Sequence, residues 1–96
     1  MSVLDVEKID LITEENLIKD GWVRVSLARW VRSVDVKIRN SKYTHQFLAR
    51  LVQQISDEWS LQIPFTEHFI TVEDMLTLKI SIINGLENQG YELVRY

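Results

Sequence analysis

The residues best suited to chemistry in this chain are its two histidines. His45 and His68 can serve as metal ligands or general bases when a carboxylate such as Glu67 lies nearby. Their spacing matches no known ligand motif, and the two histidines do not lie one helical turn apart. We therefore expect ordinary surface or partly buried histidines, and the sequence predicts no metal site and no cofactor.

Other catalytic patterns are missing from the sequence. The absence of cysteine excludes disulfides, thiol catalysis and thiolate-bound metals, and it fits a reducing cytoplasm. The serines at positions 26, 33 and 41 have no histidine pattern that marks a nucleophile. The three glycines are isolated, so there is neither a phosphate loop nor a dinucleotide fingerprint. We expect a non-enzymatic protein without catalytic residues.

Charge is unevenly distributed along the chain. Residues 1–20 hold six acids and two lysines, which gives −4, and residues 57–96 hold seven acids and two bases, which gives −5. Residues 21–56 hold seven bases and one acid, which gives +6 and brings the net charge to −3. A polarised surface of this kind favours docking to a partner of complementary charge.

The basic segment predicts a cationic hairpin surface. Alternation between 22 and 39 predicts two strands, with apolar side chains directed inward and three cations directed into solvent. Two further arginines fall in the expected connection beside a tryptophan, which would serve as an aromatic anchor at the tip. The candidate binding residues are Arg24, Arg29, Trp30, Arg32, Lys37 and Arg39. The competing interpretation is an ordinary sheet face whose cations pair with the acidic segments, with Trp30 in the core.

Two partner classes fit this surface. The leading hypothesis is a small regulatory, inhibitory or adaptor protein that binds another protein. The alternative is binding of single-stranded nucleic acid or RNA through the same basic residues, since cations neutralise phosphates and aromatic rings stack on bases. The overall acidity weakens this alternative. Homo-oligomers can also form where sheet edges are unprotected.

Neither export nor membrane insertion is expected from the sequence. The first ten residues lack a basic start and a continuous apolar run, so no secretory signal is expected. The apolar runs are too short to span a membrane, and we expect no membrane partner. A compact, motif-poor chain of this kind is what we expect of a small cytoplasmic accessory protein, phage proteins included.

Local patterns predict the elements that would position these residues. Residues 13–21 predict a short helix capped by Thr13 and ended by Gly21. Residues 22–27 and 34–39 predict the two strands of the hairpin, with the connection near residues 28–33 and Val23, Val25, Val34, Val36 and Ile38 facing inward. Residues 41–59 show an apolar stripe with helical spacing and predict a second helix.

The last third of the chain is ambiguous. Residues 60–65 predict a short edge strand ended by Pro64. Residues 72–89 carry caps at both ends and favour a helix that begins near Thr71, although residues 76–82 alternate strictly and precede a hairpin-like Asn-Gly pair. Lys79 falls within the apolar arc of that helix. Residues 91–96 predict a closing strand.

Together these elements predict one α+β domain over residues 1–96. It would contain a small antiparallel sheet of three to four strands, with two amphipathic helices packed on one face and a short N-terminal helix.

Overall fold

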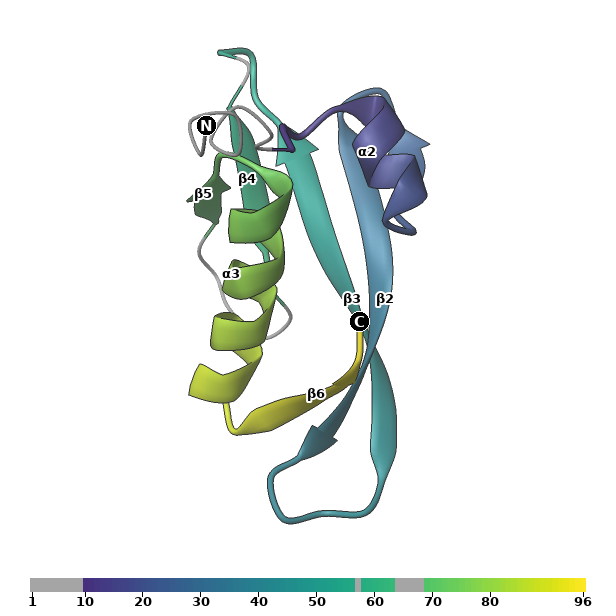
Figure 1. Cartoon of the computed structure of the whole chain (residues 1–96), viewed down its shortest axis with the longest axis vertical. Helices are drawn as coiled ribbons and strands as arrows, with labels where there is room; N and C mark the ends of the chain where they lie inside the picture. The colour runs from purple at the N-terminus through teal and green to yellow at the C-terminus, as the bar shows by residue number, and fades with distance from the viewer. Residues whose placement is uncertain (1–9, 57, 64–68) are drawn as a thin grey trace, which may run out of the picture.

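The computed structural model describes residues 10–56, 58–63 and 69–96 as an antiparallel sheet with a core on one face (Figure 1). The core face also holds the two described helices, since both contribute buried side chains to a single hydrophobic cluster. The elements in chain order are α2 (Glu14–Lys19), β1 (Val23–Ser26), β2 (Arg29–Ile38), β3 (Thr44–Gln53), β4 (Trp59–Gln62), β5 (Ile70–Val72), α3 (Met75–Asn88) and β6 (Tyr91–Arg95).

The strand order explains how the chain closes. Strands β1 to β5 lie side by side in sequence order, and β6 pairs with β2 outside this path. Strand β1 pairs with β2 at residues 29–31, whereas β6 pairs with it at residues 35–38. Because β3 occupies the other edge of β2, β1 and β6 share one edge of the same strand. Figure 1 shows β6 running from the end of α3 back to β2.

The predicted helix at residues 41–59 is wrong, and the predicted fold class fails with it. Most of this segment is strand β3, which pairs with both β2 and β4. Ala49 and Leu51 are buried on the core face, while Leu48 and Val52 lie on the opposite face. Apolar residues on both faces of a strand produce pairs three and four residues apart, which imitate a helical stripe. The described part of the chain holds six strands and two helices, one of them short.

The hairpin was predicted, but its turn and its inward face were misplaced. Strand β2 already begins at Arg29, so the turn is at residues 27–28 rather than 28–33. Val34 and Val36 are buried as predicted, whereas Ile38, Val23 and Val25 are exposed. The β1 error follows from the register: Arg24 pairs with Trp30 on the core face, which turns Val23 and its partner Val31 to the other face.

The two helices that form follow their capping signals. The N–H of Asn16 donates to Thr13 Oγ1 at 3.1 Å, and Gly21 adopts a φ of 94°, as expected for a helix stop. Helix α3 confirms the helical interpretation of residues 72–89, but Asp74 and not Thr71 is its N-cap. The helix begins later than predicted because residues 70–72 belong to strand β5. A capping box joins Asp74 to Thr77.

Helix α3 packs one narrow stripe onto the sheet. Leu78, Ile82 and Leu86 are fully buried, while Leu76 and Ile80 are exposed. The remaining buried apolar residues come from every other described element except β1 and β6, and from the connecting segments. They are Ile12, Leu17, Trp22, Trp30, Val34, Val36, Ala49, Leu51, Leu61, Ile63 and Val72.

The two closing strand predictions are partly confirmed. The predicted edge strand near residues 60–65 is β4, but it lies between β3 and β5 and is therefore not an edge; Pro64 lies outside the described residues. The predicted closing strand is β6. No helix in the described part of the chain is long and apolar enough to cross a membrane.

Candidate functional site

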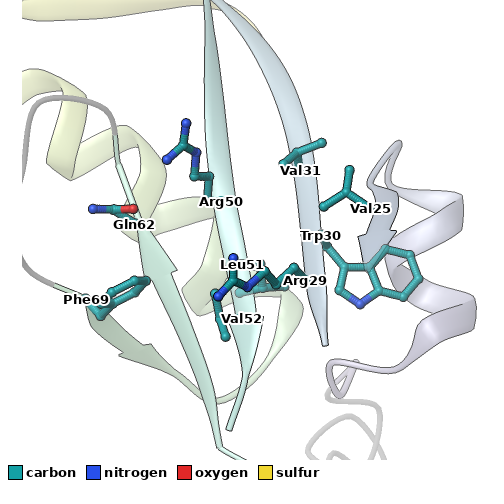
Figure 2. Close-up of a pocket in the computed structure, with 9 residues that line it drawn as sticks. All are labelled: Val25, Arg29, Trp30, Val31, Arg50, Leu51, Val52, Gln62 and Phe69. Atoms are coloured by element: carbon teal, nitrogen blue, oxygen red, sulfur yellow. The ribbon is translucent and has the colours of Figure 1, made fainter. Parts of the chain in front are cut away.

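The candidate site lies on the sheet face that points away from the core, here called the outer face. It contains a hollow of about 320 Å³ that crosses the sheet from β1 to the start of β5 (Figure 2). The hollow is lined by Val25, Arg29, Trp30, Val31, Arg50, Leu51, Val52, Gln62 and Phe69. Among the described residues, this lining contains three valines, a leucine, two aromatic residues, Gln62 and two arginines, but no acid.

The pairing of β2 with β3 fixes the arrangement of the two arginines. Arg29 pairs with Val52, and Val31 pairs with Arg50, so cation and valine alternate across the two strands. Side chains directly opposite each other in such a pair are about 5 Å apart at Cβ, and diagonal neighbours about 7–8 Å. The two arginines therefore occupy one diagonal of this pair of strands, and Val31 and Val52 occupy the other.

Arg29 and Arg50 differ from Arg24, Arg32, Lys37 and Arg39 in having no partner within the described part of the chain. Both are exposed, and neither makes an ion pair or a side-chain hydrogen bond within the described part of the chain. Figure 2 shows Arg29 extending from β2 toward Val52 on β3. Exposed guanidinium groups can bind carboxylates or phosphates, and their stems can pack on apolar surface.

The hollow has an apolar residue at each end. Val25 on β1 is 56% exposed, and Phe69 beyond β4 is 53% exposed. Among the described lining residues, Phe69 is the aromatic residue whose ring is exposed, since Trp30 is 3% exposed and belongs to the core. The hollow is therefore bounded by apolar side chains and has its charge in the middle.

The six predicted binding residues do not form one surface. Trp30 is buried, so the predicted exposed anchor is wrong, and Arg24 lies on the core face with its guanidinium 5.7 Å from the centroid of that ring. Arg24 also pairs with Glu14 at 3.5 Å. The cause is the register of β1, which turns Arg24 to the same face as Trp30.

The other predicted cations are dispersed. Lys37 shares the outer face with Arg29, but eight residues along the strand place it about 26 Å away, and it pairs with Glu92 at 3.6 Å. Arg39 follows β2, with one guanidinium nitrogen 3.5 Å from the carbonyl oxygen of Glu87. Of the six residues, Arg29 and the buried Trp30 line the hollow.

Sequence reasoning missed most of the outer face. Arg50, Val52 and Val31 went unrecognised because residues 41–59 were interpreted as a helix and residues 28–33 as a loop. The signal that would have found them is period two from residue 48 to 52, where every second side chain shares a face. No local pattern brings Gln62 and Phe69 to the same place, because their position depends on the pairing of β3, β4 and β5.

Arg32 belongs to a polar cluster on the core side of the sheet. One carboxylate oxygen of Asp20 accepts hydrogen bonds from Trp22 Nε1 at 3.2 Å and from the Tyr96 hydroxyl at 2.7 Å. Arg32 pairs with the same oxygen at 3.2 Å and donates to the backbone carbonyl of Asp20. Its guanidinium lies 3.7 Å from the centroid of the Tyr96 ring.

This cluster connects α2, β2 and the end of β6 and pairs Arg32 with Asp20, although Arg32 Nε is buried without a hydrogen-bond partner among the described residues. Burial raises the pKa of Tyr96 well above its ordinary value, and the adjacent Asp20 carboxylate raises it further. The phenol therefore stays protonated and donates to Asp20. Because the carboxylate already has three partners within the protein, the arrangement favours a structural role.

The histidines add no site to the described chain. His45 is exposed on β3, and His68 and Glu67 lie outside the described residues. No group of three or more histidine, aspartate or glutamate side chains that could hold a metal ion occurs among the residues that the structure describes.

Comparison of this chain with protein-family models, curated proteins and solved structures found no match.

Proposed function

We propose that this chain is a small non-enzymatic protein that binds another protein in the cytoplasm, as an adaptor, inhibitor or regulator. Its docking surface is the hollow of the outer face. The observation that carries the proposal is the pair of exposed arginines, Arg29 and Arg50, which have no partner among the described residues and line a mostly apolar hollow.

The chemistry of this surface matches that of protein interfaces. Arginine is enriched at interfaces and among the residues that dominate binding energy, because its stem packs on apolar surface while its head group makes directed hydrogen bonds. The valines opposite the arginines supply apolar area that a partner removes from water, at about 25 cal/mol per Å² before the costs of association are subtracted. Val31 and Val52 are half-buried, so part of their surface is open to a partner.

The same surface fits single-stranded nucleic acid less well. Proteins that bind single strands combine cations with several aromatic rings on which successive bases stack. Within the described lining of the hollow, Phe69 alone presents an exposed ring, because Trp30 is buried and the other apolar side chains are aliphatic. Aliphatic contacts favour protein side chains over bases.

Cross-linking and capture from cells of the source organism test the proposal. Affinity-tagged protein carrying a photo-reactive residue at Leu48, which is exposed on the outer face beside the hollow, should cross-link to a defined protein. The Arg50→Glu variant should lose that product about tenfold or more. Leu76→Glu, an exposed position on α3, is the matched control and should leave the product unchanged.

Two results would contradict this proposal. Equal loss of the product in the Leu76→Glu control would show that the outer face is not the docking surface. Micromolar binding of a mixed-sequence oligonucleotide that weakens steeply with salt, and that disappears in an Arg29→Ala/Arg50→Ala variant, would replace protein binding by nucleic-acid binding.

A further inference from the structure

We infer that the partner presents an acidic, extended segment with two carboxylates two residues apart, followed at the same spacing by an apolar side chain. This inference rests on the proposed function and adds the chemistry of the partner. It is carried by the positions of Arg29, Arg50 and Phe69 around the hollow.

The spacing of the arginines matches an extended acidic segment. Arg29 and Arg50 are diagonal neighbours on β2 and β3, so their Cβ atoms are about 7–8 Å apart. In an extended chain, side chains two residues apart point the same way at about 6.6–6.8 Å. Flexible arginine stems absorb the difference, so each guanidinium can take one carboxylate, in the bidentate geometry that arginine favours.

The next side chain on the same side of such a segment reaches an apolar region. Ile70 pairs with Leu61, which places the preceding Phe69 beside Gln62 on the far side of Arg50. Figure 2 shows Gln62 and Phe69 together on the side of the hollow away from β2. Phe69 lies two strand spacings from Arg50, about 9–10 Å across the sheet. A long apolar side chain two positions beyond the second carboxylate would span the remaining gap, contact the exposed ring of Phe69 and be removed from water there.

Within the described residues, no acidic segment of a second copy fits the hollow as well as a foreign segment would. Asp5, Glu7 and Ile9 have the required spacing in the sequence, so the experiments below also test for a second copy. The acids of α2 with a neighbouring exposed aliphatic residue, Ile18, are the nearest match that the described chain offers. Both acids already form ion pairs, since Glu14 pairs with Arg24 and Glu15 pairs with Lys19. They also follow each other directly in a helix, so they do not reproduce the spacing of the two arginines.

Labelled peptides test the inference on the intact chain. The probe is a fluorescein-labelled peptide with the central sequence Glu-Ser-Glu-Ser-Leu, and its binding is followed by fluorescence anisotropy at low and physiological salt. Replacing both glutamates by glutamine should weaken binding about tenfold or more, because the charge-assisted bonds are lost. Replacing the leucine by serine should weaken it several-fold.

Variants of the protein test whether the peptide binds to the outer face. Arg50→Glu should abolish binding of the acidic peptide, and the Leu76→Glu control should bind it as the unmodified chain does. An Arg29→Glu/Arg50→Glu variant should bind the matching peptide Lys-Ser-Lys-Ser-Leu in preference to the acidic one. This exchange of charge cannot be explained by misfolding.

The outcomes separate this inference from the proposed function. Loss of the cellular cross-link in Arg50→Glu combined with equal binding of the glutamate and glutamine peptides would overturn the acidic segment and leave protein docking intact. Failure of both experiments would remove the proposed function as well. Self-association in sedimentation that disappears in Arg50→Glu would overturn the inference in favour of a second copy.

Discussion

At the scale of single residues, the cluster around Asp20 is the main polar contact between distant segments. Asp20 is 12 residues from Arg32 and 76 residues from Tyr96 in the sequence. Asp20 had the position of an ordinary helix-terminal acid, and Arg32 that of a loop cation. No period or motif predicts such a pairing, because it exists only once β2 and β6 are adjacent and α2 lies against them.

Removing Asp20 should destabilise the fold strongly. Asp20→Ala leaves the largely buried Arg32 without its ion-pair partner and deprives Trp22 and Tyr96 of an acceptor. We expect a loss of about 2–3 kcal/mol in the free energy of unfolding, measured by urea denaturation. Glu15→Ala breaks an exposed pair with Lys19 and should cost less than about 0.5 kcal/mol. Equal costs for the two variants would contradict this role of the cluster.

Tyr96 should make stability fall in alkaline solution. Its pKa is raised in the folded chain by burial and by Asp20, so above pH of about 10 the unfolded chain releases this proton while the folded chain keeps it. The stabilisation is therefore complete below that pH and is lost above it, at up to about 1.4 kcal/mol per pH unit, and less where solvent reaches the ring. Denaturation of Tyr96→Phe between pH 9 and 11 should show a shallower decline. An identical slope in both proteins would contradict the shift.

At the scale of elements, sequence reasoning succeeded where the signal was local. The cap at Thr13 identified the first helix. The signals between Thr71 and Gly90 identified the second, although its true N-cap is Asp74, and alternation identified the final strand. It failed at β3, because the outer face carries Leu48 and Val52, and a strand that is apolar on both faces has no clear period. Because β3 was interpreted as a helix, the candidate site was also missed. Sequence reasoning named Arg29 as a binding residue but did not name Arg50, its diagonal neighbour on β3.

The close packing of α3 against the sheet can be tested by the stability of a variant at Gly85. A Cβ at Gly85 would lie 2.8 Å from Cγ1 of Ile63, a residue that is fully buried. Gly85→Ala should therefore cost about 1–3 kcal/mol from overpacking, although alanine favours a helix by up to about 1 kcal/mol. Asn84→Ala, at the neighbouring exposed position, should be neutral or slightly stabilising. A Gly85→Ala variant that is more stable in thermal denaturation would contradict this close approach.

At the scale of the whole molecule, the backbone amides of β2 should be the best protected against hydrogen exchange. This strand pairs with β3 along one edge and with β1 and β6 along the other. Hydrogen exchange followed by mass spectrometry should show peptides covering Val34 and Val36 exchanging only by global unfolding. Peptides covering β1, whose four residues are all exposed, should exchange by local opening at least about a hundredfold faster. Equal protection of β1 and β2 would contradict this distribution of stability.

The sharing of one edge of β2 by β1 and β6 also affects how the protein is made. While the chain is still being synthesised on a ribosome, the backbone of Asp35–Ile38 has no second partner until residues 91–95 have emerged. Strand pairs so distant in sequence close slowly, because a long loop must be ordered before any contact forms. Nascent chains halted before residue 91 should therefore be protease-sensitive and in need of chaperones, whereas chains extended past residue 96 should resist digestion.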